Sequence, residues 1–228
     1  MARLFRQEGA LAGRHALVTS GPTIEPIDSV RYIANRSSGK QGHAIAAALT
    51  ARGAKVTLVS GPVDQQPPAD VTHIAVETAN DMLAACEAAL PADIAVCAAA
   101  VADWRVKPGN SQPAGKLKKQ EGAAPQLQLV ENPDILATLS RHSHRPRLVV
   151  GFAAEAENLQ ANAAAKLARK GCDWLVANAV TRAGGSSVFN SDSNSALFLA
   201  GNKHENWPEM PKSALAERLA DRVEAHFA

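Results

Sequence analysis

Short apolar runs alternate with longer runs of helical character along most of the chain. The compact apolar runs predict β-strands, which we place at 15–20, 55–60, 73–78, 93–99, 126–130, 147–152 and 173–178. The run at 93–99 is uninterrupted, a pattern typical of strands that are buried on both faces of a parallel sheet. The helical runs between the strands predict helices, which we place at 43–52, 78–90, 132–140, 156–170 and 213–226.

Residues that favour helix ends support several of these boundaries. Thr78 and Asp81 have the spacing of a capping box at the start of the second helix. Asn132 is the expected N-cap of the third helix, and Pro133 suits its first position. Gly53 suits the C-terminal end of the first helix.

Repeated β-α-β units with short connections predict an α/β fold. We expect a doubly wound, Rossmann-like parallel sheet with helices on both faces. After Gly184 the chain becomes polar and rich in turn residues, which predicts a small β-rich C-terminal extension. Without repeats or a linker, residues 1–228 are expected to form a single domain, with 1–12 flexible. Ligands of such sheets bind beyond the carboxyl ends of the strands, so the residues after each strand are the ones to inspect.

Composition narrows the classes of partner. Apolar residues make up 46% of the 228 residues, enough for one substantial core, and the net charge is only +2. That balance argues against nucleic acid as the main partner. The three cysteines show no disulfide or zinc spacing, and no run is long enough to span a bilayer. We expect a cytoplasmic protein that is not bound to a membrane, with its cysteines buried as small apolar residues.

The segment after the first strand ends in NRSSGKQG, residues 35–42, where a helix is expected to begin. Unpaired N–H groups and the positive end of the helix dipole favour an anion there, and the glycines allow a close approach. The sequence matches neither the P-loop nor the dinucleotide fingerprint. The alternative is an ordinary helix cap formed by Ser37 or Ser38.

Further candidate residues follow the fourth strand. Ala98 and Ala99 are small enough for a flat ring to lie against the backbone, and Asp103 could accept hydrogen bonds from ribose or lie near a metal. Asp103 could equally cap a helix or form a turn. The segment 105–125 carries GKLKK and has no clear period, so it could be a mobile lid that brings cations to phosphates. A solvated charged face is the alternative for this run of lysines.

The later strands are followed by a second group of candidates. The expected helix start at 132–135 offers free N–H groups, and Phe152 could stack on a base or belong to the core. Lys166 and Lys170 are four residues apart and therefore share one helix face, which could contact the ligand or solvent. The seven histidines show no triad or metal-ligand spacing, so histidine-based nucleophilic catalysis has no support.

The order of these motifs resembles one enzyme family over about residues 13–226. The motifs are TSGPTIEPIDSVRYIANRSSGKQG, AAAVADWR, GKLKK, NPDIL, VGFAAE with KLARKG, and FNSDSN. Together they resemble phosphopantothenate–cysteine ligase, also called phosphopantothenoylcysteine synthetase, of the bacterial CTP-dependent type. In many bacteria this domain follows a flavin-dependent decarboxylase in one bifunctional chain.

The resemblance implies a ligase of coenzyme A biosynthesis, in the acid–amino-acid ligase class. The carboxylate of 4′-phosphopantothenate would attack the α-phosphate of CTP, giving an acyl-cytidylate and pyrophosphate, with Mg²⁺ as cofactor. The amine of L-cysteine would then displace CMP. The implied partners are these substrates, a second copy of the chain in a homodimer, and a phosphopantothenoylcysteine decarboxylase domain or protein.

The resemblance also implies roles for individual residues. The catalytic residues would be Asn35, which would act on the acyl-cytidylate, and Lys116, which would meet the triphosphate. The nucleotide would contact Ala98, Ala99, Asp103, Lys116, Pro133, Asp134, Ile135, Leu136, Phe152, Lys166 and Lys170. The substrate would contact Arg31, Asn35, Ser37, Ser38 and Gly39. No residue is assigned as a metal ligand.

Two departures from the family pattern and three rival interpretations remain. The loop RVKPGNSQPAGKLKK is a few residues longer than in relatives, and the first turn reads SGPT where a glycine pair is common. An NAD(P)-dependent oxidoreductase would need a GxGxxG turn and an acidic residue after the second strand, where Ser60 stands. The other rivals are an ATP-using form of the ligase and a catalytically silent nucleotide-binding subunit.

Overall fold

The main sheet has eight strands and is largely parallel. A computed structural model describes residues 9–109, 115, 126–155, 158–179 and 191–228. The strand order is β12-β11-β10-β9-β6-β1-β4-β5. The strands are β1 (His15–Ser20), β4 (Lys55–Ser60), β5 (Val71–Ala75), β6 (Ile94–Cys97), β9 (Leu148–Glu155), β10 (Trp174–Ala179), β11 (Ser193–Ala200) and β12 (Lys203–Pro211). The first six pair in parallel, whereas β11 and β12 extend the sheet in antiparallel fashion. The expected α/β fold and β-rich extension are therefore confirmed.

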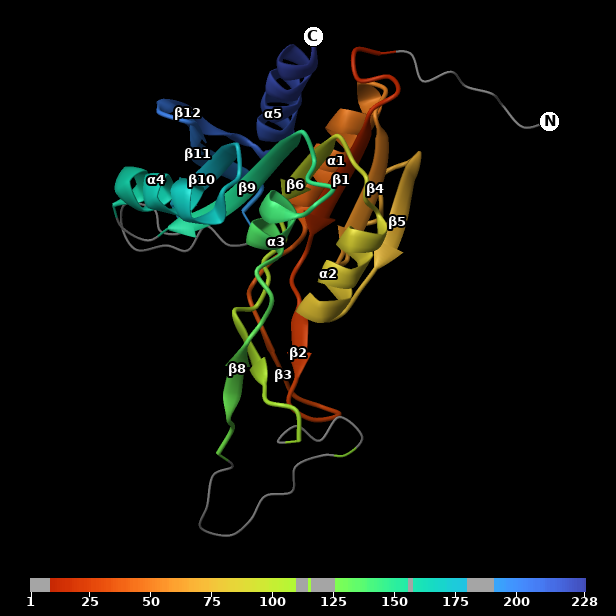
Figure 1. Cartoon of the computed structure of the whole chain (residues 1–228), viewed down its shortest axis with the longest axis vertical. Helices are drawn as coiled ribbons and strands as arrows, with labels where there is room; N and C mark the ends of the chain where they lie inside the picture. Colours follow the sequence, from red (N-terminus) through yellow and green to blue (C-terminus); the bar gives the residue numbers. More distant parts are fainter. Residues whose placement is uncertain (1–8, 110–114, 116–125, 156–157, 180–190) are drawn as a thin grey trace, which may run out of the picture.

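Helices cover both faces of this sheet (Figure 1). Helices α1 (Lys40–Ala51) and α5 (Lys212–Phe227) pack in one core, which receives Ala16 and Val18 of β1. Leu17 of the same strand points into the second core, beneath α2 (Ala79–Ala88), α3 (Ile135–Arg141) and α4 (Leu159–Lys170). The alternation places successive side chains in opposite cores, which explains why the central strands are apolar throughout.

Two short hairpins project from the carboxyl ends of the central strands, and we call them the arm. One hairpin pairs β2 (Ile24–Pro26) with β3 (Tyr32–Ala34), and the other pairs β7 (Trp104–Val106) with β8 (Leu129–Glu131). Figure 1 shows them extending away from the main sheet, on the side opposite the C-terminus. The strand predicted at 126–130 therefore belongs to the arm rather than to the main sheet.

The predicted helix ends are partly correct. Thr78 and Asp81 form the expected capping box of α2. Asn132 and Pro133 do not begin α3, however, because Asp134 is its N-cap and accepts a hydrogen bond from the Ala137 amide at 3.0 Å. The Asn132 side chain is engaged elsewhere, since it donates to the Ala102 carbonyl oxygen at 2.8 Å.

The N-terminal part of the chain joins the fold before the first strand. Within the segment that we expected to be flexible, Leu11 is fully buried, and its amide donates to the Arg52 carbonyl oxygen at 2.9 Å. Residues 1–8 lie outside the described residues. Among the helices of the described residues, none combines the length and apolarity needed to cross a bilayer.

Candidate functional site

A cavity of about 960 Å³ opens at the carboxyl ends of the central strands. Its floor includes Thr19 of β1, Cys97 of β6, Phe152 of β9 and Asn178 of β10. The N-terminal ends of α1, α3 and α5 reach the same cavity. This is the position at which ligands of doubly wound sheets bind.

One wall of the cavity is the segment after β6, and its backbone is hydrogen-bonded to β1 and to the segment that follows β1. The Ala99 amide donates to Thr19 Oγ1 at 3.2 Å, and the Ala102 amide donates to Thr23 Oγ1 at 2.9 Å. The alanines carry only a methyl group, and two of the backbone amides of this wall are held by threonine hydroxyls. A flat group could therefore lie against the wall.

The opposite wall is the loop that leads into α1. Asn35 Nδ2 donates to the Val101 carbonyl oxygen at 2.8 Å, which connects this loop to the wall after β6. Gly39 has φ 71°, and a Cβ added there would lie 2.9 Å from Val63 Cγ1. A side chain at Gly39 would be strained in both conformation and contact. The loop can therefore bring its backbone close to a ligand.

The N-terminus of α1 has no side-chain cap, so the alternative of a Ser37 or Ser38 cap is wrong. Beneath the loop, Ser20 Oγ donates to the Gly39 carbonyl oxygen at 2.9 Å, and His43 Nδ1 lies 3.1 Å from the same oxygen. Burial lowers the pKa of His43, although its contact with the Gly39 carbonyl opposes the shift. The imidazole is thus favoured in its neutral form under a loop suited to anions.

The far side of the cavity carries a carboxylate–lysine pair between α3 and α4. Asp134, the N-cap of α3, accepts a hydrogen bond from Lys170 Nζ, and the Lys170 side chain is only 16% exposed. Burial alone would raise the pKa of Asp134, but Lys170 and the Ala137 amide outweigh it and lower that pKa. Lys166 also lines the cavity, so the interpretation of these two lysines as a solvent-facing stripe is wrong.

The structure gathers most of the predicted site residues around this one cavity. Phe152 is half-buried, so it both packs against the core and lines the cavity. Fourteen predicted residues line it: Asn35, Ser37, Ser38, Gly39, Ala98, Ala99, Asp103, Pro133, Asp134, Ile135, Leu136, Phe152, Lys166 and Lys170. Arg31 does not, because it lies in the arm and pairs with Asp28 at 3.3 Å. Lys116 and most of the predicted lid lie outside the described residues.

Six further polar side chains line the cavity: Arg36, Lys40, Asn132, Asn178, Asn194 and Lys212. Arg36 and Lys40 belong to the predicted anion-binding motif NRSSGKQG, and Asn132 belongs to the expected helix start, although none of the three was assigned a ligand. Asn178, Asn194 and Lys212 were missed, and of these Asn178 could have been found because it ends a predicted strand. Lys212 reaches the cavity only because β12 returns α5 to the face that α1 occupies, which the local sequence does not indicate.

Comparison with known proteins adds independent findings. Residues 11–227 match the family model described as DNA/pantothenate metabolism flavoprotein C-terminal domain. The chain is 41% identical over 225 residues to the coenzyme A biosynthesis bifunctional protein CoaBC of Haemophilus influenzae. That match covers 98% of this chain and 54% of the relative, so the chain spans about half the length of the curated relatives it matches.

Solved structures give the same picture. The crystal structure of the C-terminal domain of a CoaBC protein superposes with a TM-score of 0.78 and 33% identity, covering 96% of this chain and 98% of that one. A Cab2 mutant in complex with phosphopantothenate-cysteine has a TM-score of 0.72 at 15% identity, covering 94% of this chain and 87% of that one. This second likeness supports the fold alone.

Proposed function

The chain belongs to the family of the DNA/pantothenate metabolism flavoprotein C-terminal domain, and we propose that it is a phosphopantothenate–cysteine ligase. It would join 4′-phosphopantothenate and L-cysteine into 4′-phosphopantothenoyl-cysteine at the expense of CTP. Its relatives are named as coenzyme A biosynthesis proteins, which supports this reaction.

One observation of the site carries the proposal: the loop with Asn35 and the segment after β6 form two facing walls of one cavity at the carboxyl ends of the strands. A carboxylate is a poor acyl donor until one of its oxygens becomes part of a good leaving group. Transfer of a cytidylyl group supplies that leaving group without a protein nucleophile. Positioning and electrostatic stabilisation are then sufficient, and the amides, lysines and helix N-termini of this cavity suit both.

The nucleotide is assigned to the α3–α4 side of the cavity. Asp103 would accept hydrogen bonds from the ribose, and Phe152 would pack against the base or sugar. Lys166 and Lys170 would face the phosphates, and Lys170 would exchange part of its contact with Asp134 for the ligand. Lys116, assigned to the triphosphate on family resemblance alone, lies outside the described residues.

The reacting carboxylate is assigned to the gap between Asn35 and the wall after β6. Asn35 Nδ2 already donates to a carbonyl oxygen there, so the same amide could donate to the acyl oxygen of the intermediate. Polarising that oxygen makes the acyl carbon more electrophilic, which favours attack by the cysteine amine. Ser37, Ser38 and Gly39 would contact a phosphorylated group at the start of α1.

Magnesium fits this site as a companion of the nucleotide. Among the described residues, no group of three or more His, Cys, Asp or Glu side chains is placed to hold a metal ion by itself. Mg²⁺ is commonly held by substrate phosphates, waters and one or two carboxylates, and Asp103, Glu131 and Asp134 line the cavity. Bound there, the ion would neutralise charge on the triphosphate.

A homodimer is the proposed assembly, with the arm as its contact surface. The large exposed apolar side chains of the described residues are Val30, Tyr32, Trp104 and Leu129, and all four belong to the arm. Apolar side chains gathered in this way favour burial against a partner.

A phosphopantothenoylcysteine decarboxylase domain is the second proposed partner, because the bifunctional relatives are about twice as long as this match.

The proposal is tested by measuring pyrophosphate release with CTP and with ATP side by side. We expect CTP to give pyrophosphate and CMP only when 4′-phosphopantothenate is present, and L-cysteine to accelerate turnover. Equal rates with ATP would overturn the assignment of CTP as the nucleotide, but the assignment of ligase activity would stand. Nucleotide binding without pyrophosphate release under any of these conditions would instead favour a silent nucleotide-binding subunit.

A further inference from the structure

Two lysines occupy equivalent places at the first positions of neighbouring helices. Lys40 is the first residue of α1 and Lys212 is the first residue of α5, and the two helices pack side by side on one face of the sheet. Both side chains line the cavity. Gln41 Nε2 donates to the Lys212 carbonyl oxygen at 3.3 Å, which holds the two helix starts together.

One exposed carboxylate lies between these cations. Asp192 accepts a hydrogen bond from Lys40 Nζ, and its carbonyl oxygen accepts the Lys212 amide at 2.9 Å. The Asp192 side chain is 85% exposed, and among the described residues Lys40 is the group that hydrogen-bonds its carboxylate. An incoming anion could take over this contact at little cost, because water is available to the displaced carboxylate.

The positive charge exceeds what Asp192 neutralises. The ion pairs of the described residues include none made by Lys212. Partial burial, and then the nearby charge of Lys40, lower the pKa of Lys212, while Asp192 opposes the shift. A cation in such surroundings gains from a further anion, which would offset both the burial and the repulsion between the lysines.

The backbone adds to this preference. Neither α1 nor α5 has a side-chain cap, since Gly39 and Pro211 stand at their N-cap positions. The helices are 12 and 16 residues long, so both helix dipoles are fully developed. The Lys212 amide is already bonded to the Asp192 carbonyl oxygen, but the other first N–H groups of the two helices and two ammonium groups meet at one end of the cavity, away from the Lys166 and Lys170 side.

We propose that Lys40 and Lys212 form a phosphate-binding subsite. In the absence of ligand the Asp192 carboxylate occupies this subsite, and the phosphate group of the ligand displaces it. The inference rests on the proposed function for the identity of its ligand. Two substrates of that reaction could supply the group: the phosphomonoester of 4′-phosphopantothenate and the triphosphate of CTP. In both cases Lys212 is a binding residue that no motif of the sequence indicates.

The test compares Lys212→Met with Lys203→Met, a matched loss of charge on an exposed lysine of β12 outside the cavity. The KM for CTP and the KM for 4′-phosphopantothenate are measured separately, and Lys212→Arg serves as the conservative variant. Calorimetric titration with inorganic pyrophosphate measures anion binding without catalysis. Thermal unfolding of each variant shows that the fold is retained.

For Lys212→Met we expect one KM to rise about tenfold, the usual scale for a lost charge-assisted hydrogen bond, with most of it restored in Lys212→Arg. A rise for 4′-phosphopantothenate identifies the phosphomonoester, and a rise for CTP identifies the triphosphate. If Lys212→Met changes neither KM by more than Lys203→Met does, the proposed subsite is wrong.

Asp192→Asn provides a second test that does not depend on how Lys212→Met folds. Removing the competing carboxylate should strengthen the binding of inorganic pyrophosphate, whereas unchanged or weaker binding would contradict the role assigned to Asp192. This titration also separates the two proposals. If the protein binds pyrophosphate in this manner but ligates nothing, the subsite stands and the ligase is wrong.

Discussion

Asn35 lies where the loop before α1 meets the segment after β6, and its single described contact is with the Val101 carbonyl oxygen at 2.8 Å. The rest of its amide is available to the cavity, because the residue is exposed. The position of Asn35 relative to the acyl group of the intermediate determines which half-reaction this residue assists. An amide donor next to the acyl oxygen assists attack on carbon rather than formation of the cytidylate.

Asn35→Ala should therefore let the first half-reaction proceed and slow the second. We expect acyl-cytidylate to accumulate, with cysteine-dependent turnover reduced about 100-fold, as for loss of one oxyanion donor. Rapid quench and mass spectrometry would detect the intermediate. Asn206→Ala on β12 is the control, since Asn206 is exposed and outside the cavity. Normal amide formation by Asn35→Ala would refute its role in the second step.

Single residues show how far local sequence can predict a site. Asp103 follows a predicted strand and Phe152 ends one, so both could be chosen by position, whereas Asn35 was chosen from the family resemblance; all three line the cavity. The choice of Asn132 over Asp134 as the cap of α3 was wrong, because both are good caps and only the long-range bond of Asn132 to Ala102 decides between them. Arg31 was predicted to contact the substrate because it belongs to the family motif, but it lies in the arm, where it pairs with Asp28, and does not line the cavity.

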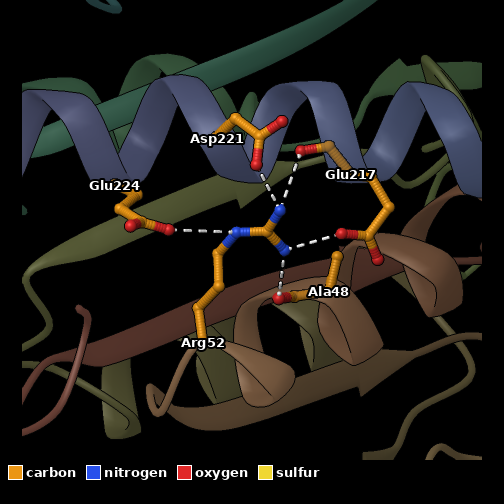
Figure 2. Close-up of polar contacts among 5 residues, drawn as sticks. All are labelled: Ala48, Arg52, Glu217, Asp221 and Glu224. Atoms are coloured by element: carbon orange, nitrogen blue, oxygen red, sulfur yellow. Dashed lines mark hydrogen bonds and ion pairs between the residues drawn. The ribbon is translucent and has the colours of Figure 1, made fainter. Parts of the chain in front are cut away.

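At the scale of elements, α1 and α5 are joined by one arginine at the end away from the cavity. Figure 2 shows the Arg52 guanidinium between three carboxylates of α5 and the Ala48 carbonyl oxygen of α1. Glu217 lies 2.8 Å and Glu224 3.4 Å from it, and Asp221 completes the set. Arg52 is only 15% exposed, so this network is less screened by solvent than an ordinary surface pair.

Arg52→Met should lower the free energy of unfolding by about 2 kcal/mol, because it leaves three carboxylates repelling one another beside a partly buried position. Urea denaturation followed by circular dichroism measures the change. Arg222→Met is the comparison, since Arg222 makes one ion pair with Glu205 and is 49% exposed. That variant should lose less than about 1 kcal/mol. Equal losses in the two variants would contradict a special role for the Arg52 network.

Elements differ in how well the sequence predicts them. The strands of the central sheet and the capping box of α2 were found because they carry apolar runs or a fixed spacing of polar residues. Three of the four arm strands were missed, because each has only three residues, too few to display a period, and the fourth, β8, was predicted within 126–130 but not as part of an arm. Helix α1 begins at Lys40 rather than at residue 43, since the glycine before it adopts a left-handed conformation that ends the loop.

For the whole molecule, the rule that ligands bind at the carboxyl ends of parallel strands was sufficient to locate the cavity. This rule could not predict that Lys212 lines the cavity, because the final helix reaches the cavity only after two antiparallel strands that follow the parallel sheet. The resulting site has lysines at two ends, with Lys166 and Lys170 on one helical face of the sheet and Lys40 and Lys212 on the other. Two separately bound phosphorylated groups would suit this arrangement.

The proposed ligase activates a carboxylate by transfer of a cytidylyl group. The most direct test uses 4′-phosphopantothenate whose carboxylate carries heavy oxygen in both positions, turned over with CTP and L-cysteine. If the carboxylate attacks the α-phosphate and the cysteine amine then attacks carbon, CMP receives one heavy oxygen and the amide carbonyl keeps the other. Mass spectrometry should find this label in CMP and none in pyrophosphate. Unlabelled CMP, or heavy oxygen in released phosphate or pyrophosphate, would contradict the account.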